Sequence, residues 1–587
     1  MSLLRAHGLS VTARLGGVEV AALDGLSLSL APGKVLGLVG ESGAGKSMLG
    51  RAIAQLLPPG FAVSAGVLEF AGQDLVAMAP DQRRNLLGRQ IGFIPQEPLS
   101  ALNPVRSIGS QFAEHLRRLG VVDWRSAAIT ALDAVQLPDL LDRFPHQLSG
   151  GMCQRVLIAM AFASNPALVV ADEPTTALDV TIQARIITLM RDLQIAHNTA
   201  VLFITHDLRL AAQVCDDIAV LYAGRVVEHG PADVVLAQPL HPYTKCLLLA
   251  APAISGPRQA LYALPDQMPG LRALADMTGC RFAPRCPLAR DTCRDAVPAL
   301  EGEAHKIACP HFGDIGQIVV SELAPAPVVA TGETLVSVRG LGKTFRGRFG
   351  RTPTIAVRDV SFSIAAGEFV GVVGESGSGK STLARLLMGL EHKSAGDIHL
   401  VGQDVGRWDA AARRLRLRTA QMVFQDPQSA LNPRRRVGEI VTQALEAAGI
   451  GLAERRVRAA EILADLGMPL ELADRAPSQL SGGQRQRVNI GRALCLVPKL
   501  LVADEIVSGL DVSVQAQLLA LLARLRAEHG FALLLISHDL AVVRYLCERV
   551  MVMRNGEVVE AGRTEDVFAN PQHAYTRELL ASVPAPP

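Results

Sequence analysis

The chain has 587 residues, of which 49% are hydrophobic and 19% charged, and this composition excludes wholesale disorder because it can bury enough apolar surface to offset chain entropy. At roughly 150 residues per domain, the length predicts about four structural units rather than one core. Lys plus Arg (58) against Asp plus Glu (56) gives a formal net charge of +2, which does not indicate a protein that binds nucleic acid mainly by charge.

The apolar stretches of the chain are short, although its mean hydropathy is +0.26. A membrane-spanning helix needs about 20 consecutive apolar residues, and we expect none. The strongest stretches are typical of strands buried on both faces of a parallel sheet; they are residues 167–171, 201–205, 500–503 and 531–536. The first ten residues lack the pattern of a secretory signal. We therefore expect a cytoplasmic protein whose nine cysteines are thiols or metal ligands more often than disulfides.

A glycine-rich loop follows an apolar strand early in the chain and returns in its second half. Strand 35–39 precedes Gly40-Glu-Ser-Gly-Ala-Gly-Lys-Ser47, and strand 369–373 precedes Gly374-Glu-Ser-Gly-Ser-Gly-Lys-Ser381. This pattern is the P-loop, whose backbone N–H groups approach phosphates, whose Lys neutralises phosphate charge and whose Ser holds Mg²⁺. We assign Lys46 and Lys380 to the phosphates, Ser47 and Ser381 to Mg²⁺, and Gly40, Gly43, Gly45, Gly374, Gly377 and Gly379 to the nucleotide-binding loops.

Two acidic residues end a later buried strand in each half. Leu168-Val-Val-Ala-Asp172 is followed by Glu173, and Leu500-Leu-Val-Ala-Asp504 by Glu505. Open α/β sheets bind ligands at the carboxyl ends of their strands, so these acids should face the nucleotide. The first acid would support Mg²⁺ and the second would polarise the attacking water. The alternative interpretation is that the acids only cap the next helix.

The motifs repeat in one order and at nearly one spacing. The P-loops are 334 residues apart (374 − 40), Gln96 and Gln425 are 329 apart, and the pairs Ser149 with Ser481 and His206 with His538 are each 332 apart. A period of about 330 residues is too long for a solenoid and indicates a duplicated domain. We expect an α/β fold with tandem P-loop nucleotide hydrolase domains, each with a helical subdomain, at residues 97–147 and 426–479, plus a small Cys-rich segment between the domains.

The complete motif set resembles ATP-binding cassette (ABC) proteins in both halves. Leu148-Ser-Gly-Gly-Met152 and Leu480-Ser-Gly-Gly-Gln484 are similar to the family's signature motif. Gln96 and Gln425 match its Q-loop, Ala177-Leu-Asp179 and Gly509-Leu-Asp511 its D-loop, and His206 and His538 its switch histidine.

The resemblance implies an ATPase in which two ATP molecules lie between two cassettes arranged head to tail, here within one chain and with no second copy required. Site one would combine Lys46, Ser47, Gln96, Asp172, Glu173 and His206 with Ser481, Gly482 and Gly483 of the other half. Site two would combine Lys380, Ser381, Gln425, Asp504, Glu505 and His538 with Ser149, Gly150 and Gly151. The resemblance makes Glu173, His206, Glu505 and His538 catalytic, and places Gln96 and Gln425 beside Ser47 and Ser381 as Mg²⁺ ligands.

The adenine-stacking position differs between the halves. The family usually stacks adenine on an aromatic residue near the first strand, and Phe345 can fill that place in the second half. Ala13 stands at the expected position in the first half, where Arg14 is the alternative stacking residue. Weaker nucleotide binding at site one is the expected consequence.

Two further departures fall near the catalytic motifs. Met152 replaces Gln in the first signature, and Ile506 stands where the first half has Pro174, which could alter the following turn. Both glutamates and both histidines remain, so we expect hydrolysis at both sites.

A string after each Q-loop glutamine resembles the peptide/nickel import branch of the family. It reads Gln96-Glu-Pro-Leu-Ser-Ala-Leu-Asn-Pro104 in the first half and Gln425-Asp-Pro-Gln-Ser-Ala-Leu-Asn-Pro433 in the second. His241-Pro-Tyr-Thr244, echoed as His573-Ala-Tyr-Thr576, and the stretch 279–287 are similar to ATPase subunits of oligopeptide and dipeptide importers. The resemblance implies two membrane permease subunits and a solute-binding protein as partners, no nucleic acid, and a peripheral location on the cytoplasmic face of the inner membrane.

A rival hypothesis is a soluble tandem-cassette ATPase that acts on ribosomes or DNA. Such proteins resemble chains with cysteines before the first cassette or with a basic linker. Here the clustered cysteines lie between the halves, and the Pro/Ala-rich connector 322–333 contains no Lys or Arg.

Four of the nine cysteines fall within thirty residues: Cys280, Cys286, Cys293 and Cys309. This clustering favours metal ligation, and four thiolates suit a [4Fe–4S] cluster or zinc. The absence of a C-x2-C pair makes a zinc ribbon less favoured, and unmetallated thiols are the third alternative. We expect a structural role. The predicted domains are 1–246 (first cassette), 247–312 (Cys-rich segment), 313–334 (linker) and 335–587 (second cassette).

Overall fold

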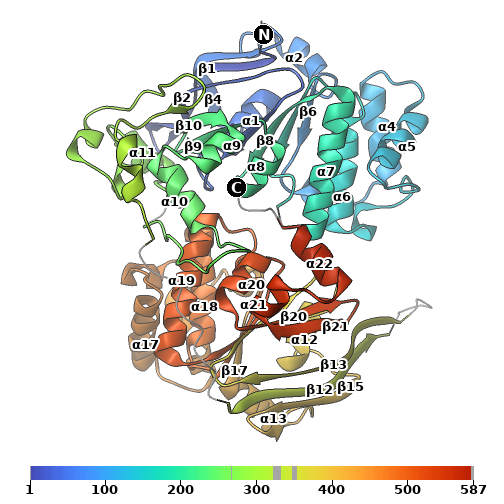
Figure 1. Cartoon of the computed structure of the whole chain (residues 1–587), viewed down its shortest axis with the longest axis vertical. Coiled ribbons are helices and arrows are strands. Elements are labelled where there is room, and N and C mark those ends of the chain that lie inside the picture. Colours follow the sequence, from blue (N-terminus) through green and yellow to red (C-terminus); the bar gives the residue numbers. More distant parts are fainter. Residues whose placement is uncertain (1, 177, 266–267, 321–331, 347–352, 584–587) are drawn as a thin grey trace.

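The computed structural model contains two α/β halves that lie one above the other along the longest axis of the molecule (Figure 1). The structure describes residues 2–176, 178–265, 268–320, 332–346 and 353–583. Each half contains one four-stranded antiparallel sheet and one larger, mainly parallel sheet. The tandem α/β architecture predicted from the sequence is confirmed.

The larger sheet of the first half has the order β11-β10-β9-β3-β8-β7-β6, with parallel pairing from β9 to β6. Its smaller sheet has the order β2-β1-β4-β5. The strands are β1 (Leu4–Leu15), β2 (Val18–Leu30), β3 (Val35–Val39), β4 (Phe61–Phe70), β5 (Gln73–Asp74), β6 (Ile91–Ile94), β7 (Leu168–Asp172), β8 (Ala200–Thr205), β9 (Asp217–Tyr222), β10 (Arg225–Pro231) and β11 (Lys306–Ile307).

The second half repeats this plan with the orders β17-β18-β19-β14-β20-β21 and β13-β12-β15-β16. Its strands are β12 (Thr334–Phe345), β13 (Thr354–Ala365), β14 (Phe369–Val373), β15 (Ala395–Leu400), β16 (Gln403–Asp404), β17 (Ala420–Val423), β18 (Leu500–Asp504), β19 (Ala532–Ile536), β20 (Arg549–Arg554) and β21 (Glu557–Arg563).

The helices cover the larger sheets and form a helical subdomain in each half, α3 to α5 and α14 to α17, within the predicted ranges. Those of the first half are α1 (Lys46–Ala54), α2 (Pro80–Leu86), α3 (Pro98–Ala101), α4 (Ile108–Arg118), α5 (Trp124–Ala134), α6 (Gly150–Phe162), α7 (Val180–His197), α8 (Leu208–Val214), α9 (Ala232–Ala237), α10 (Pro242–Ala250) and α11 (Leu271–Ala275). Those of the second half are α12 (Lys380–Leu387), α13 (Ala410–Thr419), α14 (Pro427–Ala430), α15 (Val437–Val441), α16 (Gln443–Ala447), α17 (Leu452–Asp465), α18 (Gly482–Leu494), α19 (Val512–His529), α20 (Leu540–Leu546), α21 (Thr564–Ala569) and α22 (Ala574–Ala581).

Every residue of the strands that carry the predicted phosphate chemistry is buried: β3, β7, β14 and β18. Helices on both faces of a parallel sheet exclude water from both sides of each strand, so these strands read as continuous apolar runs. The P-loops and acidic pairs follow directly at their carboxyl ends.

Residues 251–320 connect the halves and contact both of them. Ile254 and Leu261 pack against the core of the second half, whereas Leu264 and Phe282 belong to the core of the first. The strand β11 adds to the edge of the first half's sheet beside β10. The predicted boundary between residues 246 and 247 falls inside α10, and the predicted connector lies mostly outside the described residues.

Among the described helices, none combines the length and the apolar character that crossing a bilayer would require.

Candidate functional site

The first P-loop joins β3 to α1 and curls around the ammonium group of Lys46. Lys46 Nζ donates hydrogen bonds to the carbonyl oxygens of Gly40 (2.7 Å) and Glu41 (3.0 Å). Gly45 adopts φ 104°, and a Cβ there would lie 2.7 Å from the carbonyl oxygen of Ala22, so the turn requires glycine. Burial lowers the pKa of Lys46 and outweighs the opposing effect of nearby carboxylates.

The P-loop serine lies beside the first acid of the Asp-Glu pair. Ser47 Oγ donates to Asp172 Oδ1 at 2.8 Å. Asp172 is buried at the end of β7, and this burial raises the pKa of its carboxyl group. A hydroxyl and a carboxylate brought together in this way are oxygen ligands of the kind that Mg²⁺ prefers.

The second acid is held by side chains from three other segments. Glu173 Oε2 accepts hydrogen bonds from Gln96 Nε2 (3.0 Å) and Thr176 Oγ1 (2.9 Å), and it lies 3.4 Å from His206 Nδ1. Burial alone would raise the pKa of Glu173, but the interactions with His206 and Lys46 outweigh it and lower the pKa to about 2. Burial likewise opposes the charge on His206, yet the hydrogen bond to Glu173 raises the histidine pKa above its usual value. The structure thus brings the Q-loop, Asp-Glu and switch residues together.

The second half repeats these contacts. Lys380 Nζ donates to the carbonyl oxygens of Gly374 (2.6 Å) and Glu375 (2.8 Å), and Ser381 Oγ donates to Asp504 Oδ1 (3.0 Å). Gln425 Nε2 donates to Glu505 Oε2 at 2.6 Å, and His538 Nδ1 lies 3.7 Å from the same oxygen. The pKa shifts have the same directions: burial lowers the pKa of Lys380 and raises that of Asp504, while His538 lowers the pKa of Glu505 against the effect of burial.

The residue after each glutamate differs, but the turn is the same. Glu173 has φ 47° and Glu505 φ 49°, both in the left-handed region. Their backbone N–H groups donate to the carbonyls of Ile204 (3.0 Å) and Ile536 (2.9 Å). The backbone of the two glutamates is therefore alike, although Ile506 stands where the first half has Pro174.

The signature serines are the N-caps of α6 and α18. Ser149 Oγ accepts a hydrogen bond from the N–H of Met152 (3.3 Å), and Ser481 Oγ accepts one from the N–H of Gln484 (3.2 Å). In α18 the Oε1 of Gln484 also accepts a hydrogen bond from the N–H of Ser481 (3.0 Å). This second bond completes a capping box, which Met152 cannot form in α6 because it has no acceptor of this kind. Both motifs thus present helix N-termini, which favour anions.

The D-loop aspartates reach the P-loop of the opposite half. Asp511 Oδ1 accepts hydrogen bonds from Ser42 N (2.9 Å) and Ser42 Oγ (3.0 Å), and Asp179 Oδ2 accepts one from Ser376 N (3.2 Å). Thr181 Oγ1 donates to Glu375 Oε1 at 3.0 Å across the same interface. Ala177 of the first D-loop lies outside the described residues. The halves are therefore joined reciprocally at their phosphate-binding loops.

A cavity of about 180 Å³ between the halves is lined by the two switch histidines and both D-loops, including His206, His538, Leu178 and Gly509. Next to it, α22 contacts α7, where Arg185 Nη2 lies 3.2 Å from Glu578 Oε1 (Figure 1).

Two site residues that sequence reasoning missed are the tyrosines of the repeated His-x-Tyr-Thr segments. Tyr243 Oη accepts a hydrogen bond from the N–H of Glu41 (2.9 Å), and Tyr575 Oη accepts one from the N–H of Glu375 (2.9 Å). The repetition of this segment at a spacing of 332 residues was the available signal. Asp179 and Asp511 repeat at the same spacing and match the D-loops, but the sequence does not identify their P-loop partners, because these contacts form across the interface.

The residue at the proposed adenine-stacking position is an exposed phenylalanine in the second half and a buried alanine in the first. Phe345 at the end of β12 is 39% exposed, and Lys343 Nζ lies 4.6 Å from its ring centre. Ala13 is buried, while the neighbouring Arg14 is exposed. Whether these residues stack adenine stays a prediction.

The four clustered cysteines all line one cavity of about 150 Å³, and each is free of a disulfide. Burial raises the pKa of their thiols at Cys280, Cys286 and Cys309, and that of Cys286 reaches about 12. Within the described ranges, no three His, Cys, Asp or Glu side chains come together in a way that could hold one metal ion. The metal site predicted from the spacing therefore stays a prediction.

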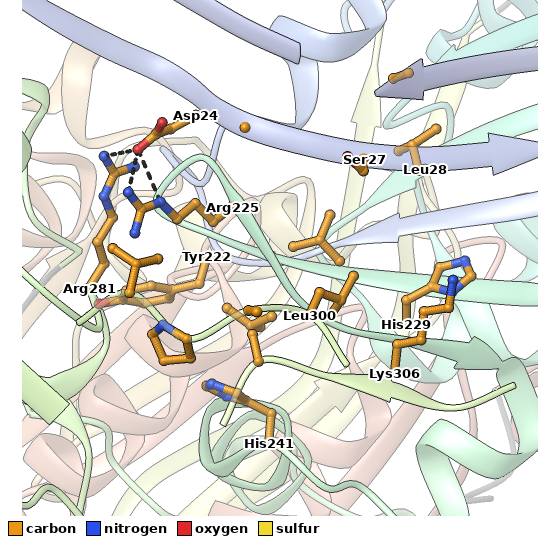
Figure 2. Close-up of a pocket in the computed structure, with 18 of the residues that line it drawn as sticks. Asp24, Ser27, Leu28, Tyr222, Arg225, His229, His241, Arg281, Leu300 and Lys306 are labelled. Carbon is orange, nitrogen blue, oxygen red and sulfur yellow. Dashed lines mark hydrogen bonds and ion pairs between the residues drawn. The ribbon is translucent and has the colours of Figure 1, made fainter. Parts of the chain in front are cut away.

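A larger pocket, of about 670 Å³, lies between β2, β10 and the Cys-rich segment, and its lining contains no P-loop residue. Figure 2 shows Arg225 and Arg281 directed at the same carboxylate, that of Asp24, with Arg281 Nη2 2.6 Å from Asp24 Oδ2. This arrangement attaches the Cys-rich segment to β2.

Comparison with known proteins agrees with this geometry. A family model described as "ABC transporter" matches residues 23–176 and 357–508, and one described as "Oligopeptide/dipeptide transporter, C-terminal region" matches residues 227–293 and 559–587. The chain is 41% identical over 608 residues to the oligopeptide transport ATP-binding protein OppD of Mycobacterium bovis, covering 100% of this chain and 98% of that protein. It is 39% identical over 599 residues to the glutathione import ATP-binding protein GsiA of Salmonella choleraesuis, covering 99% and 89%.

Among solved structures, the ATP-binding cassette MJ0796 bound to ADP and Pi is 31% identical and aligns with 39% of this chain and 98% of its own, at a TM-score of 0.36. The family models cover both sets of nucleotide-binding motifs, and the relatives extend along the whole chain. The chain therefore belongs to the ABC transporter family, as an ATPase with two cassettes in tandem.

Proposed function

We propose that this protein is the energy-coupling ATPase of an importer for oligopeptides or dipeptides, and that it hydrolyses ATP at two sites formed between its own halves. The observation that carries the proposal is the reciprocal contact of each D-loop aspartate with the opposite P-loop. This contact leaves each phosphate-binding loop facing the half that carries the other signature motif.

Phosphate binding rests on Lys46 at site one and Lys380 at site two. Each ammonium group now shares its protons with two P-loop carbonyl oxygens, and the phosphates of ATP would replace these carbonyls as partners. Because burial disfavours the charged lysine, an anionic partner gains affinity from the exchange.

Ser47 and Gln96 at site one, and Ser381 and Gln425 at site two, would hold Mg²⁺, with Asp172 and Asp504 in support. When bound, Mg²⁺ neutralises charge that develops on the phosphates. The hydrogen bond between each serine and aspartate keeps these oxygens together.

Glu173 and Glu505 would orient and polarise the attacking water. A pKa of about 2 keeps Glu173 ionised at neutral pH, so it accepts a hydrogen bond from water but is a weak base. His206 Nδ1 and His538 Nδ1 lie 3.4 and 3.7 Å from these carboxylates and would hold them in place by charge attraction. The signature N-termini of the opposite half would complete each site by donating backbone N–H groups to the γ-phosphate.

The transported class rests on the relatives and on the C-terminal family model. The relatives are named for oligopeptide transport and glutathione import, and glutathione is itself a small peptide. We infer two permease subunits and a solute-binding protein as partners, and a peripheral position on the cytoplasmic face of the inner membrane. The names of these relatives do not support the rival hypothesis, in which the protein acts on ribosomes or DNA.

For the cysteines we propose a [4Fe–4S] cluster held by Cys280, Cys286, Cys293 and Cys309, with zinc as the alternative. Support comes from the single cavity that all four line. Four irons separate their thiolate ligands more widely than one zinc ion, which holds sulfur at about 2.3 Å. Iron, sulfide and zinc analysis of anaerobically purified protein tests this proposal, and a preparation that contains neither metal would contradict it.

Two single-site variants test the catalytic proposal. Glu173→Gln and Glu505→Gln should each slow hydrolysis at their own site by about 100-fold or more and leave turnover at the other site measurable. Phosphate release under saturating ATP, with and without EDTA, is the measurement. If one substitution abolishes all turnover and the other has no effect, the prediction that both sites hydrolyse ATP is wrong.

A further inference from the structure

Glu41 of the first P-loop is held at each of its polar groups. Its N–H donates to Tyr243 Oη at 2.9 Å, and its carbonyl oxygen accepts from Lys46 Nζ at 3.0 Å. Its carboxylate is buried and accepts hydrogen bonds from Arg285 and Ser513. Glu41 thus joins Arg285 and Ser513, which contact its side chain, to the P-loop lysine, which contacts its backbone.

Arg285 binds this carboxylate with two parallel hydrogen bonds. Arg285 Nη1 lies 2.8 Å from Glu41 Oε2 and Nη2 lies 3.0 Å from Oε1, with side-chain exposures of 2% and 6%. Arg285 Nε also donates to the carbonyl oxygen of Pro265 at 2.9 Å. Burial alone would lower the pKa of Arg285, but the bonds to Glu41 raise it above its usual value. Bidentate pairs of this kind combine strength with a defined geometry.

Arg285 belongs to the Cys-rich segment and lies 244 residues after Glu41 in the chain. It ends the short 3₁₀ helix η2 (Ala283–Arg285), directly before Cys286 and five residues after Cys280. Both cysteines line the cavity described above. Ser513, which also donates to Glu41, comes from α19 of the second half. The Cys-rich segment and the second half of the molecule thus meet on one P-loop carboxylate.

The equivalent glutamate of the second half has a different partner. Glu375 accepts a hydrogen bond from Thr181 Oγ1, and its N–H donates to Tyr575 Oη. In the part of the chain that the structure describes, Glu375 forms no ion pair with an arginine or lysine. The contact between P-loop and Cys-rich segment therefore distinguishes site one from site two.

We propose that Arg285 is a positioning residue for the ATP site at Lys46, and that it makes nucleotide binding at this site, but not at the Lys380 site, depend on the conformation of the Cys-rich segment. The inference rests on the proposed function, because it takes Lys46 and Lys380 as ATP-binding residues.

The physical reason is the position of Glu41 between Arg285 and Lys46. Without the guanidinium, the buried carboxylate loses its counter-charge and must either move to solvent or attract the nearest cation. Lys46 is 4.0 Å from a second carboxylate, that of Glu173, and its ammonium already contacts the Glu41 carbonyl. Either movement displaces the ammonium from the place that the phosphates would occupy.

The test separates the two sites by removing one P-loop lysine at a time. Lys380→Ala leaves site one, and Lys46→Ala leaves site two. The Kd for Mg-ATP is measured by titration calorimetry in each background, with and without Arg285→Met. We expect Arg285→Met to weaken binding about tenfold when only site one remains and less than twofold when only site two remains. Arg285→Lys, which keeps the charge but not the bidentate geometry, should give an intermediate loss.

Arg281→Met is the matched control. Arg281 is a buried arginine of the same segment, but it pairs with Asp24 and the carbonyl oxygen of Ala223 rather than with the P-loop. It should leave both Kd values within twofold.

The outcomes distinguish the inference from the function on which it rests. Equal weakening at both sites by Arg285→Met, or the same loss with Arg281→Met, contradicts the inference. If Arg285→Met does not fold, the same comparison made with Arg285→Lys decides. Loss of all ATP binding in both Lys→Ala backgrounds contradicts the proposed function itself.

Discussion

Glu173 and His206 illustrate how single side chains affect one another's charge at the proposed ATP site. The interaction with the histidine helps to lower the pKa of the glutamate to about 2, so the glutamate stays ionised, and the glutamate raises the pKa of the histidine. Each group is mostly buried, with side-chain exposures of 9% and 23%. Burying either charge alone would cost free energy, and the mutual attraction of the two groups offsets this desolvation cost.

The pair predicts a pH-dependent contribution to stability. Because the pKa of His206 is raised above its usual 6.5, the contribution is complete below that value and is lost as pH rises through the higher folded-state pKa. On the acid side, Glu173 starts to lose its contribution below its usual 4.5 and loses it fully near 2. His206→Gln should cost about 1.5–3 kcal/mol near pH 5.5 and clearly less near pH 9. Urea unfolding at both pH values measures this, and an equal cost at both would contradict it.

The two tyrosines that receive P-loop N–H groups offer a second prediction. Tyr243→Phe leaves the N–H of Glu41 without its partner in a buried site, which should raise the KM for ATP at site one several-fold. Tyr575→Phe should do the same at site two through Glu375. Each substitution is the control for the other when tested in the Glu505→Gln and Glu173→Gln backgrounds. A change of KM at the wrong site would show that the tyrosine acts elsewhere.

At the scale of elements, α6 and α18 begin at equivalent serines but differ in their first turn. The capping box of α18 pairs Ser481 and Gln484 twice, whereas Met152 gives α6 only the serine bond. Partly buried Met152 packs against the core of the first half instead. The first signature helix therefore has one capping hydrogen bond fewer than the second, and it has an apolar contact of Met152 instead.

This difference predicts the effect of removing the box. Gln484→Met should lower the free energy of unfolding by about 0.5–1.5 kcal/mol, because the N–H of Ser481 loses an acceptor. Gln484→Glu retains the acceptor and should have little effect. Chemical denaturation monitored by circular dichroism compares the two. A larger loss for Glu than for Met would contradict a role in capping.

The elements that could be predicted from the sequence are those with local signals. The buried strands β7, β8, β18 and β19 fall where short apolar runs stand, because burial on both faces leaves no polar alternation. The acidic pairs stand at the ends of β7 and β18, and the P-loops follow β3 and β14, as the spacing predicts.

Contacts between distant segments could not be predicted in this way. Arg285 and Glu41 are 244 residues apart, and neither belongs to a pattern that names the other as its partner. The pairing of Asp511 with Ser42 depends on how two folded halves meet. Such contacts follow from tertiary packing, which periodicity and local motifs do not encode.

On the scale of the whole molecule, residues 251–265 form a strap that leaves the first half and lies against the second. Arg258 Nε is 2.6 Å from Glu565 Oε1, and Arg544 donates to the carbonyl oxygens of Ala253 (3.2 Å) and Gly256 (2.5 Å). Leu261 packs on the core of the second half. The strap then returns to the first half at Leu264.

Loosening the strap should expose it without unfolding either half. Arg544→Met combined with Arg258→Met removes the polar contacts that these two arginines make within and to the strap, so hydrogen exchange of residues 251–265 should become about tenfold faster or more. Arg549→Met, which removes a contact to Glu368 within the second half, is the control. Unchanged exchange in the double variant would show that the remaining contacts hold the strap, which are its apolar packing and the hydrogen bonds from Arg209 and Gln517.

The strap also changes how the two halves find one another. Cassettes on separate chains associate by collision, so their ATP turnover falls on dilution. Here a covalent connection, part of which contacts both halves, keeps each D-loop aspartate near the opposite P-loop at an effective concentration of about a millimolar or more. The specific ATPase activity should therefore stay constant from micromolar to nanomolar protein. Halves that separate remain within reach of one another, so they can meet again without a collision between two molecules.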